Sequence, residues 1–343
     1  MLNKYFSFFC LIGLFLWSCQ SDTNVTAPNV EDIELDVKIK RFEQELFSLD
    51  TTNIEQGLAG QLEELKSEYP DFYEVFTQKI LVEEAMVAED EAQVIGEFIT
   101  HPNVRKLYDT TQVEFANIEL IEDDLTQAFK YYKYHFPDKP VPEVVSFLSE
   151  YVIGTFTYGD SLLAIGWDFF LGEDYAYDPR IFPQYIQQSM DKDHLVAKSI
   201  EAVSSNLVGA AEGKRMLDQM INNGKILYLK KMMLPAIPDS IIMEYTPQQM
   251  QWVRENEREV WAYLLREDLL YSTRTSDFQK LIGPSPTGTT QMPRESPGKV
   301  GNWVGWQIID RFMEQHPEVT PTDLLALKDA QDILTRSKYR PRK

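Results

Sequence analysis

The stretch from Gly283 to Phe312 limits the possible folds of this chain more than any other segment. It opens as a loop with four prolines and three glycines that ends at Gly298, after which large apolar side chains recur at helical spacing. In the predicted helix, Gly301 and Gly305 would let another backbone approach closely, while indole rings fill the space beside it. The pattern therefore predicts a helix packed tightly against a second element.

The same stretch allows a second interpretation, as an edge that binds a partner. Trp303 and Trp306 lie in the predicted helix, and Arg294 and Glu295 lie in the loop before it. The stretch contains no nucleophile with a neighbouring base, and its glycine spacing is not that of a phosphate-binding loop. We therefore expect these four residues to form a packing motif or a partner-binding motif rather than a catalytic site.

The length and the net charge of the chain limit the classes of function that it can have. A chain of 343 residues with 43% hydrophobic residues can bury a large core. Its formal net charge of -21 argues against nucleic acid as a partner, because no basic excess is present to displace counterions from phosphates. The basic tail from Arg336 to Lys343 is the exception, and we interpret it as a solvated end or as a contact for anionic lipid or an acidic partner.

The first 19 residues resemble a bacterial lipoprotein signal. The apolar run from Phe8 to Trp17 is too short for a permanent membrane span and matches the central region of an export signal. Leu16-Trp-Ser-Cys19 resembles the box that precedes a lipidated cysteine. We expect residues 1–18 to be removed and Cys19 to carry lipid, followed by a flexible tether over residues 19–30. An ordinary signal peptide with an incidental cysteine is the alternative.

Cysteine usage restricts the chemistry of the mature chain. The two cysteines, Cys10 and Cys19, both lie in this leader, so no thiol is left for a disulfide, a metal or nucleophilic attack. Acyl chains on Cys19 would anchor the protein by hydrocarbon burial. We expect a location in the cell envelope, in the outer membrane, with the periplasmic and the surface face both open.

Hydrophobic periodicity predicts an α+β fold that is mostly helical with a small central sheet. Alternating apolar residues predict a strand over residues 33–39, and β-branched or aromatic runs predict three more over residues 144–148, 155–158 and 162–171. The remainder is predicted helical, with breaks near Pro70, Pro102 and Pro137. Thr246-Pro247 and Thr320-Pro321 have the composition of helix starts. We expect an N-terminal helical region over residues 31–140 and a sheet with C-terminal helices over 141–343, integrated into one domain.

The order of a few strands followed by two long helices is that of zinc metallopeptidases. In those enzymes the first long helix carries H-E-x-x-H, which places two imidazoles and a glutamate around the metal. The helix predicted over residues 191–206 lacks this motif: if Glu201 took the place of the glutamate, Ile200 and Ser204 would stand where the histidines belong. No metal or other cofactor is therefore expected.

Three carboxylates remain as weak catalytic candidates. Asp168 interrupts an apolar run, so it must be paired, lie at a strand end, or be functional. Glu201, in the helix predicted over residues 191–206, stands where the metallopeptidases would have their glutamate. Glu257 lies on the apolar face of its predicted helix, where a buried partner such as Arg294 or Arg311 is the structural explanation and catalysis the alternative.

The chain resembles the gliding-motility lipoprotein B (GldB) family of gliding diderm bacteria. The residues that carry the resemblance are the lipoprotein box ending at Cys19, the runs Leu163-Ala-Ile-Gly-Trp-Asp-Phe-Phe-Leu-Gly-Glu-Asp-Tyr and Pro183-Gln-Tyr-Ile, and Asn223-Gly-Lys-Ile-Leu-Tyr. They continue with Trp261 to Thr273 and with Glu295-Ser-Pro-Gly-Lys-Val-Gly-Asn-Trp-Val-Gly-Trp-Gln-Ile. The resemblance covers nearly the whole mature chain.

This resemblance implies a lipid-anchored envelope protein required for gliding, whose machinery is tied to a dedicated secretion system. It also implies a zincin-like scaffold without metal, in which Asn223 and Gly224 stand where zinc-dependent relatives carry a glutamate ligand and a glycine. We therefore expect a non-enzymatic component that docks proteins of the gliding and secretion machinery. The alternatives are an envelope hydrolase that uses carboxylates such as Asp168, Glu201 or Glu257, and a surface lipoprotein that binds glycan through tyrosine and tryptophan rings.

Overall fold

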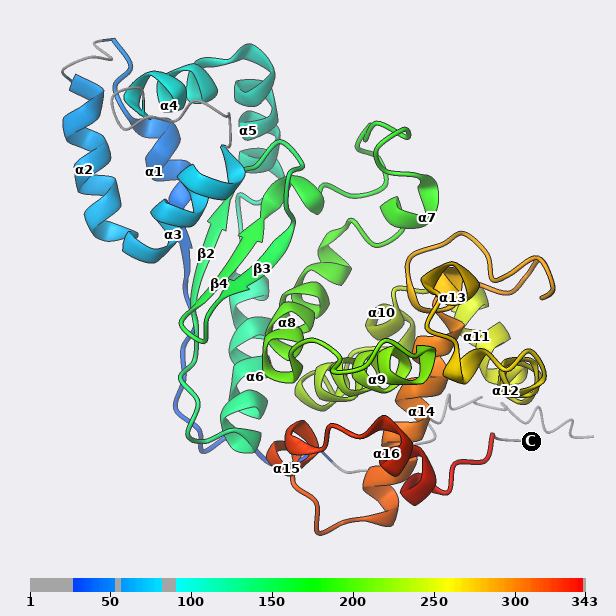
Figure 1. Cartoon of the computed structure of the whole chain (residues 1–343). Helices are drawn as coiled ribbons and strands as arrows, with labels where there is room; N and C mark the ends of the chain where they lie inside the picture. Colours follow the sequence, from blue (N-terminus) through cyan, green and yellow to red (C-terminus); the bar gives the residue numbers. More distant parts are fainter. Residues whose placement is uncertain (1–26, 53–56, 82–90, 342–343) are drawn as a thin grey trace, which may run out of the picture.

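The computed structural model describes residues 27–52, 57–81 and 91–341, and the chain within them is α+β with a small mixed sheet, as predicted (Figure 1). The predicted leader, Cys19 and the tether up to Thr26 lie outside the described residues. The N-terminal half contains β1 (Ile39–Arg41), α1 (Phe42–Ser48), α2 (Ala59–Glu68), α3 (Pro70–Val75), the π-helical turn η2 (Phe76–Ile80), α4 (Glu91–Thr100), α5 (Pro102–Glu114) and α6 (Glu119–His135).

The central part completes the sheet and the C-terminal part is helical. The central elements are β2 (Glu143–Phe147), β3 (Thr155–Tyr158), β4 (Leu162–Gly166), the 3-10 turn η3 (Trp167–Phe169), α7 (Gln184–Gln187) and α8 (Lys192–Val208). The remaining elements are α9 (Met216–Met233), α10 (Asp239–Met243), α11 (Pro247–Glu255), α12 (Glu257–Arg266), η4 (Leu269–Tyr271), α13 (Thr275–Ile282), α14 (Val300–Gln315), α15 (Pro321–Ala326) and α16 (Ala330–Ser337).

The sheet has the strand order β1-β2-β4-β3. The strands β1, β2 and β4 are parallel, and β3 runs antiparallel to β4 at the edge of the sheet. All five residues of β4 are buried, because α3 contacts this strand and α8 packs against both β4 and β3. The sheet is therefore a small covered layer within a mostly helical molecule.

Two strand predictions need correction. Residues 33–38 do not pair with a strand; instead the backbone N–H of Val37 and of Ile39 donate to Thr126 Oγ1 and Glu122 Oε1 of α6, each at 2.9 Å. The alternation of apolar residues thus reflects packing along a helix. The fourth strand ends at Gly166 rather than at residue 171, and Asp168 lies in η3 directly after it.

The helix starts were predicted well and the helix lengths less well. Thr246 and Thr320 each cap a helix through the side-chain oxygen, with proline at the first position, as predicted. The breaks at Pro70 and Pro102 are confirmed, since each begins a helix. The predicted breaks did not include the interruption at Asn256 between α11 and α12, or the one between α15 and α16.

The helices α9 and α14 cross with their backbones in contact, as the glycine pattern predicted. A β-carbon at Gly305 would overlap the carbonyl group of Met220, and one at Gly224 would overlap the carbonyl group of Gly305. A polar pair lies beside the crossing, where Asn223 Nδ2 donates to Asn302 Oδ1 at 2.9 Å. Only glycine fits at positions 224 and 305, because any side chain would push the helices apart.

We predict that Gly305→Ala lowers the free energy of unfolding by about 3 kcal/mol or more, because the new methyl group overlaps backbone that cannot move aside. Gly60→Ala in α2 is the matched control, since a β-carbon there has nothing within 4 Å. The free energy of unfolding of this control should rise by up to about 1 kcal/mol, because alanine has a higher helix propensity than glycine. Urea denaturation of the soluble chain measures both; equal effects of the two substitutions would contradict the crossing.

Candidate functional site

The carboxyl ends of β2 and β4 bring two loops together. Because these strands are parallel, the β2–β3 loop and the segment that follows β4 emerge at the same edge of the sheet, which is where open sheets commonly place functional loops. The loops cover residues 148–154 and 167–190, and the second includes α7, which Figure 1 shows projecting from the body of the molecule. This edge is the candidate functional site.

Asp168 is the buried polar centre of this site. Its side chain is fully buried, and Oδ2 accepts hydrogen bonds from the backbone N–H of Tyr151 at 2.6 Å and from Ser149 Oγ at 3.2 Å. Within the described part of the chain, Oδ1 has no hydrogen-bond partner. Burial raises the pKa of Asp168 to about 6, and the hydrogen bonds from Tyr151 and Ser149 oppose that rise.

The turn that Asp168 holds is strained. Glu150 and Tyr151 have φ values of 52° and 69°, in the left-handed region that side chains other than glycine avoid. The hydrogen bond from Tyr151 to the buried carboxylate helps to fix this conformation. Asp168 therefore lies just beyond the end of β4, and its carboxylate also fixes the conformation of the β2–β3 loop.

Aromatic side chains form the floor of the site. The hydroxyl groups of Tyr151 and Tyr175 lie 2.5 Å apart, and Tyr177 donates to the carbonyl oxygen of Asp168 at 3.0 Å. Tyr177 and Phe182 pack edge to face against Tyr151. Burial raises the pKa of Tyr151 and of Tyr177, so both hydroxyl groups stay protonated at neutral pH.

Two aliphatic side chains of these loops are exposed to solvent. Val152 is 59% exposed and Ile181 is 63% exposed, one on each of the two loops. The acids Glu150, Glu173 and Asp174 are also exposed on these loops. We call these five residues the distal surface: two exposed aliphatic side chains and three exposed acids, carried by the two loops.

Sequence reasoning missed a second buried carboxylate at the same edge. Glu43, in the first turn of α1, is fully buried and accepts hydrogen bonds from Arg41 Nε at 2.5 Å, Ser146 Oγ at 2.7 Å and Trp167 Nε1 at 3.0 Å. An acid next to an arginine at a helix start is usually solvated, so no local signal distinguishes it. Its three donors come from β1, β2 and η3, which only the tertiary fold brings together.

Sequence reasoning also missed a cluster of ion pairs between α8, α9, α10 and α14. Glu244 pairs with Lys198 and, at 2.7 Å, with Lys299, while the fully buried Lys230 pairs with Glu201 at 2.6 Å. Burial alone would raise the pKa of Glu244, but Lys299, Lys198 and Lys230 outweigh it and hold that pKa well below its usual value. The cluster ties the start of α14 to the helices that support the sheet.

The other carboxylate candidates have internal partners. Glu201, whose side chain is 40% exposed, is the counterion of Lys230. Glu257 accepts hydrogen bonds from Trp303 Nε1 at 3.3 Å and from Tyr339 Oη at 2.8 Å. Of the two arginines expected near Glu257, Arg311 pairs with Glu314, and Arg294 is exposed.

The tryptophan motif lies in the core. Trp303 and Trp306 are 4% and 3% exposed, and their rings meet edge to face, whereas Arg294 and Glu295 are exposed in the loop before α14. The two tryptophans therefore pack inside the fold, in agreement with the packing interpretation. The structure does not bring the four residues together as one exposed edge, because burial of both rings leaves only the loop charges accessible.

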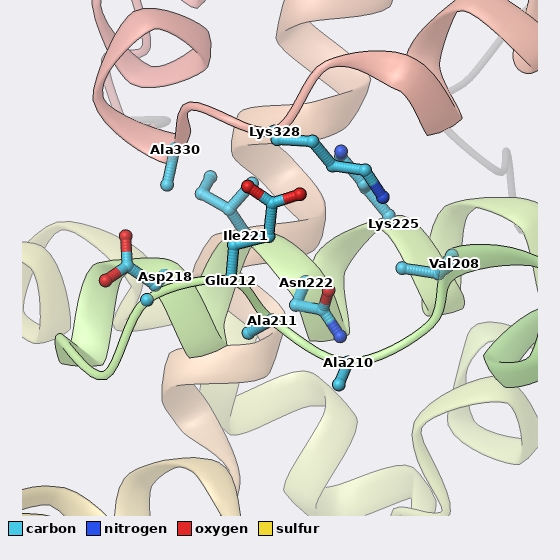
Figure 2. A pocket seen from close by; sticks show the side chains of 11 residues that line it. Val208, Ala210, Ala211, Glu212, Asp218, Ile221, Asn222, Lys225, Lys328 and Ala330 are labelled. Atoms are coloured by element: carbon cyan, nitrogen blue, oxygen red, sulfur yellow. The ribbon is translucent and has the colours of Figure 1, made fainter.

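A small pocket lies between the α8–α9 loop, α9 and the residues that precede α16 (Figure 2). Lys225 and Lys328 extend along the same side of it in Figure 2, and Lys225 Nζ donates to the carbonyl oxygen of Leu327. Burial, with a further contribution from Lys328, lowers the pKa of Lys225 to about 8. The pocket encloses about 20 Å³, which is room for a water molecule.

The described ranges contain neither a candidate metal site nor a candidate membrane span. Residues 27–52, 57–81 and 91–341 contain no group of three or more His, Cys, Asp or Glu side chains that could hold a metal ion. Over the same part of the chain, no helix is both long and apolar enough to cross a membrane.

Fold and site together define a helix-rich α+β protein with a covered mixed sheet and exposed loops at the carboxyl ends of its parallel strands. The profile of the family described as gliding motility protein GldB matches residues 23–341, and the chain belongs to this family. Membership implies a gliding motility lipoprotein with a location in the cell envelope. No curated protein and no solved structure matches the chain.

We predict that Asp168→Asn makes the protein more stable at neutral pH. The pKa of Asp168 is about 6 in the folded state against an ordinary value of 3.8, so the fold favours the protonated form and loses stability as pH rises through this range. The asparagine side chain has nearly the same shape as aspartate but carries no charge. Relative to the wild type, the variant should gain roughly 3 kcal/mol between pH 4 and pH 7.

Asp178→Asn is the control for this prediction. The Arg180 side chain lowers the pKa of Asp178 to about 2, so this carboxylate contributes stability above its unfolded pKa and loses it on acidification. The control should therefore show no gain at neutral pH. Urea denaturation between pH 4 and pH 7 measures both variants, and a flat profile for Asp168→Asn relative to wild type would refute the assignment.

We predict that Glu244→Gln destabilises the fold by about 3 kcal/mol at neutral pH, because Lys198 and Lys299 would lose the carboxylate that pairs with both of them. Asp332→Asn removes one partner of the exposed pair with Arg336 and should cost less than about 0.5 kcal/mol. Denaturant midpoints compare the two variants. A cost at Glu244 no larger than that at Asp332 would show that the cluster does not stabilise the fold.

Proposed function

We propose that this protein is a non-enzymatic docking component of the gliding and secretion machinery, held in the outer membrane by lipid on Cys19. The distal surface is proposed as the place where a protein partner binds. The observation that carries this proposal is the exposure of Val152 and Ile181, whose chain neighbours Tyr151 and Phe182 pack against each other. Exposed aliphatic side chains with a polar rim are typical of protein interaction sites.

The charge of the distal surface indicates the chemistry of the partner. Glu150, Glu173 and Asp174 are exposed on the same two loops, Arg180 beside Ile181 is paired with Asp178, and the chain as a whole carries a formal charge of -21. A partner segment that places an apolar side chain between Val152 and Ile181 would be complementary if basic side chains flanked it. We therefore propose a basic segment of a machinery protein as the ligand.

The internal contacts of the candidate carboxylates support a role without catalysis. Glu201 is the counterion of a fully buried lysine, and Glu257 is bound by an indole and a phenol. The pocket beside α9 encloses about 20 Å³, and a second pocket between α6, the turn after β3 and α8 encloses about 10 Å³, whereas small-molecule sites usually enclose a few hundred. In this proposal, Glu201 and Glu257 serve as a counterion and as a hydrogen-bond acceptor for buried groups.

We further propose that the scaffold is related to zincins and has been kept as a binding surface. The antiparallel edge strand β3 next to β4, followed by two long helices of which α8 packs on both strands, supports this proposal. Ile200 and Ser204 flank Glu201 on α8, and Asn223 on α9 bonds to Asn302. In this proposal, interior contacts have replaced the metal ligands.

We predict that Val152→Asp combined with Ile181→Asp reduces gliding and partner capture by about tenfold, because two charges would be desolvated beneath the partner. Leu265→Asp on α12 is the matched control, since Leu265 is 52% exposed but lies outside the distal surface. Colony spreading and affinity capture from envelope extracts provide the readouts. Normal gliding of the double variant at wild-type protein levels would reject this surface.

An envelope hydrolase is the second candidate, and the pKa of about 6 at the buried Asp168 favours it. For this candidate, Asp168→Asn should abolish gliding while partner capture through the distal surface persists. Glu201→Gln and Glu257→Gln extend the same test to the other carboxylates. Gliding that is unchanged in all three variants would remove the hydrolase from consideration.

A further inference from the structure

The described chain begins at one end of the molecule, beyond the C-terminal end of α6. Ile39 contacts Glu122 and Val37 contacts Thr126, so the segment before β1 runs antiparallel to α6, toward His135, as residue numbers fall. Val30 is 3% exposed, which shows that this segment is packed against the fold. Figure 1 shows the segment starting near α15, at the lower end of the view.

The distal surface lies at the opposite end of the sheet. The chain leaves α6 at His135 and enters β2 at Glu143, so the amino ends of the parallel strands face the end where the described chain begins. The distal surface is carried by loops at their carboxyl ends. A strand of five residues adds about 17 Å between the two ends, to which the loops on either side add further distance.

The link between the proposed lipid and the fold is short. Residues 20–26 separate Cys19 from Ala27, and at full extension they span about 30 Å. For comparison, any flexible chain of seven residues has a typical end-to-end distance of about 15 Å. A globular chain of this size measures roughly 50 Å across. The end where the described chain begins must therefore stay near the bilayer.

We infer that the bilayer headgroups lie against the end formed by the last turn of α6, the turn at Asp138 and α15, so that the distal surface points away from the membrane. This inference rests on the lipid at Cys19 that the proposed function includes. Tyr134, in the last turn of α6, is 51% exposed and has the amphipathic ring that suits a headgroup region. We call this end the membrane-facing end.

Length of chain rather than charge sets this orientation. The membrane-facing end carries the exposed acids Asp138 and Asp323 beside its lysines, so its described residues form no basic patch for anionic lipid. Vesicles of zwitterionic phosphatidylcholine should therefore be sufficient to orient the protein in this way. The consequence is that a lipoprotein of this geometry presents its docking loops across the aqueous space rather than along the membrane surface.

The proposed lipoprotein permits a direct test, because Cys19 is the one cysteine after residue 18 and its sulfur would carry the lipid. Full-length acylated protein is placed in phosphatidylcholine vesicles that contain a headgroup-linked acceptor dye. Single cysteines labelled with a donor dye are introduced at the membrane-facing end, as Asp138→Cys or Thr322→Cys, and at the distal surface, as Val152→Cys or Ile181→Cys. We expect energy transfer at least about twofold higher from the membrane-facing pair.

Three results would overturn the inference. The first is equal or reversed energy transfer from the two pairs. The second is a difference that persists after a flexible insertion of about 30 residues behind Thr26, because the tether length would then not set the orientation. The third is acylated protein that fails to float with vesicles, which rejects the anchor itself. None of these depends on partner capture, so failure of the docking proposal is recognised separately by the distal-surface variants.

Discussion

The backbone contact between α9 and α14 at Gly224 and Gly305 is the constraint on which the rest of this structure depends. Two helices that touch along their main chains cannot shift relative to each other without a clash, so the crossing fixes the direction of α14. The start of α14 then carries Lys299 to Glu244, and Glu244 in turn holds Lys198 of α8. Because α8 packs on β3 and β4, the crossing at one side of the molecule is linked to the sheet at the other.

Buried, hydrogen-bonded carboxylates are a second structural feature of the fold. Glu43, Asp168 and Glu257 are each almost inaccessible to solvent, and each is bound by donors from distant parts of the chain. Such acids are costly to bury unless their oxygens are satisfied, and the structure satisfies most of them with backbone, hydroxyl and indole donors. The exception is Oδ1 of Asp168, whose lack of a partner in the described chain coincides with the strained turn at Glu150 and Tyr151.

The placement of these groups connects the fold to its proposed role. The internally bound carboxylates at the carboxyl ends of the strands brace two loops, and the exposed aliphatic side chains of those loops form the distal surface. The short link to Cys19 leaves from the opposite end. A protein held in this way would use its rigid interior to keep a binding surface at a fixed distance from the membrane, which is a mechanical role that needs no chemistry.

The sequence by itself determined the class of the fold, the starts of several helices and the tight crossing. Helical periodicity, threonine caps and paired glycines are local signals, because they depend on neighbours within a few residues of each other. Only the tertiary structure decided the partners of Glu43, Glu244 and Glu257, since these donors lie far apart in the chain. It also decided that residues 33–38 bind α6 rather than a strand, because an alternating pattern records which side is buried and not what covers it.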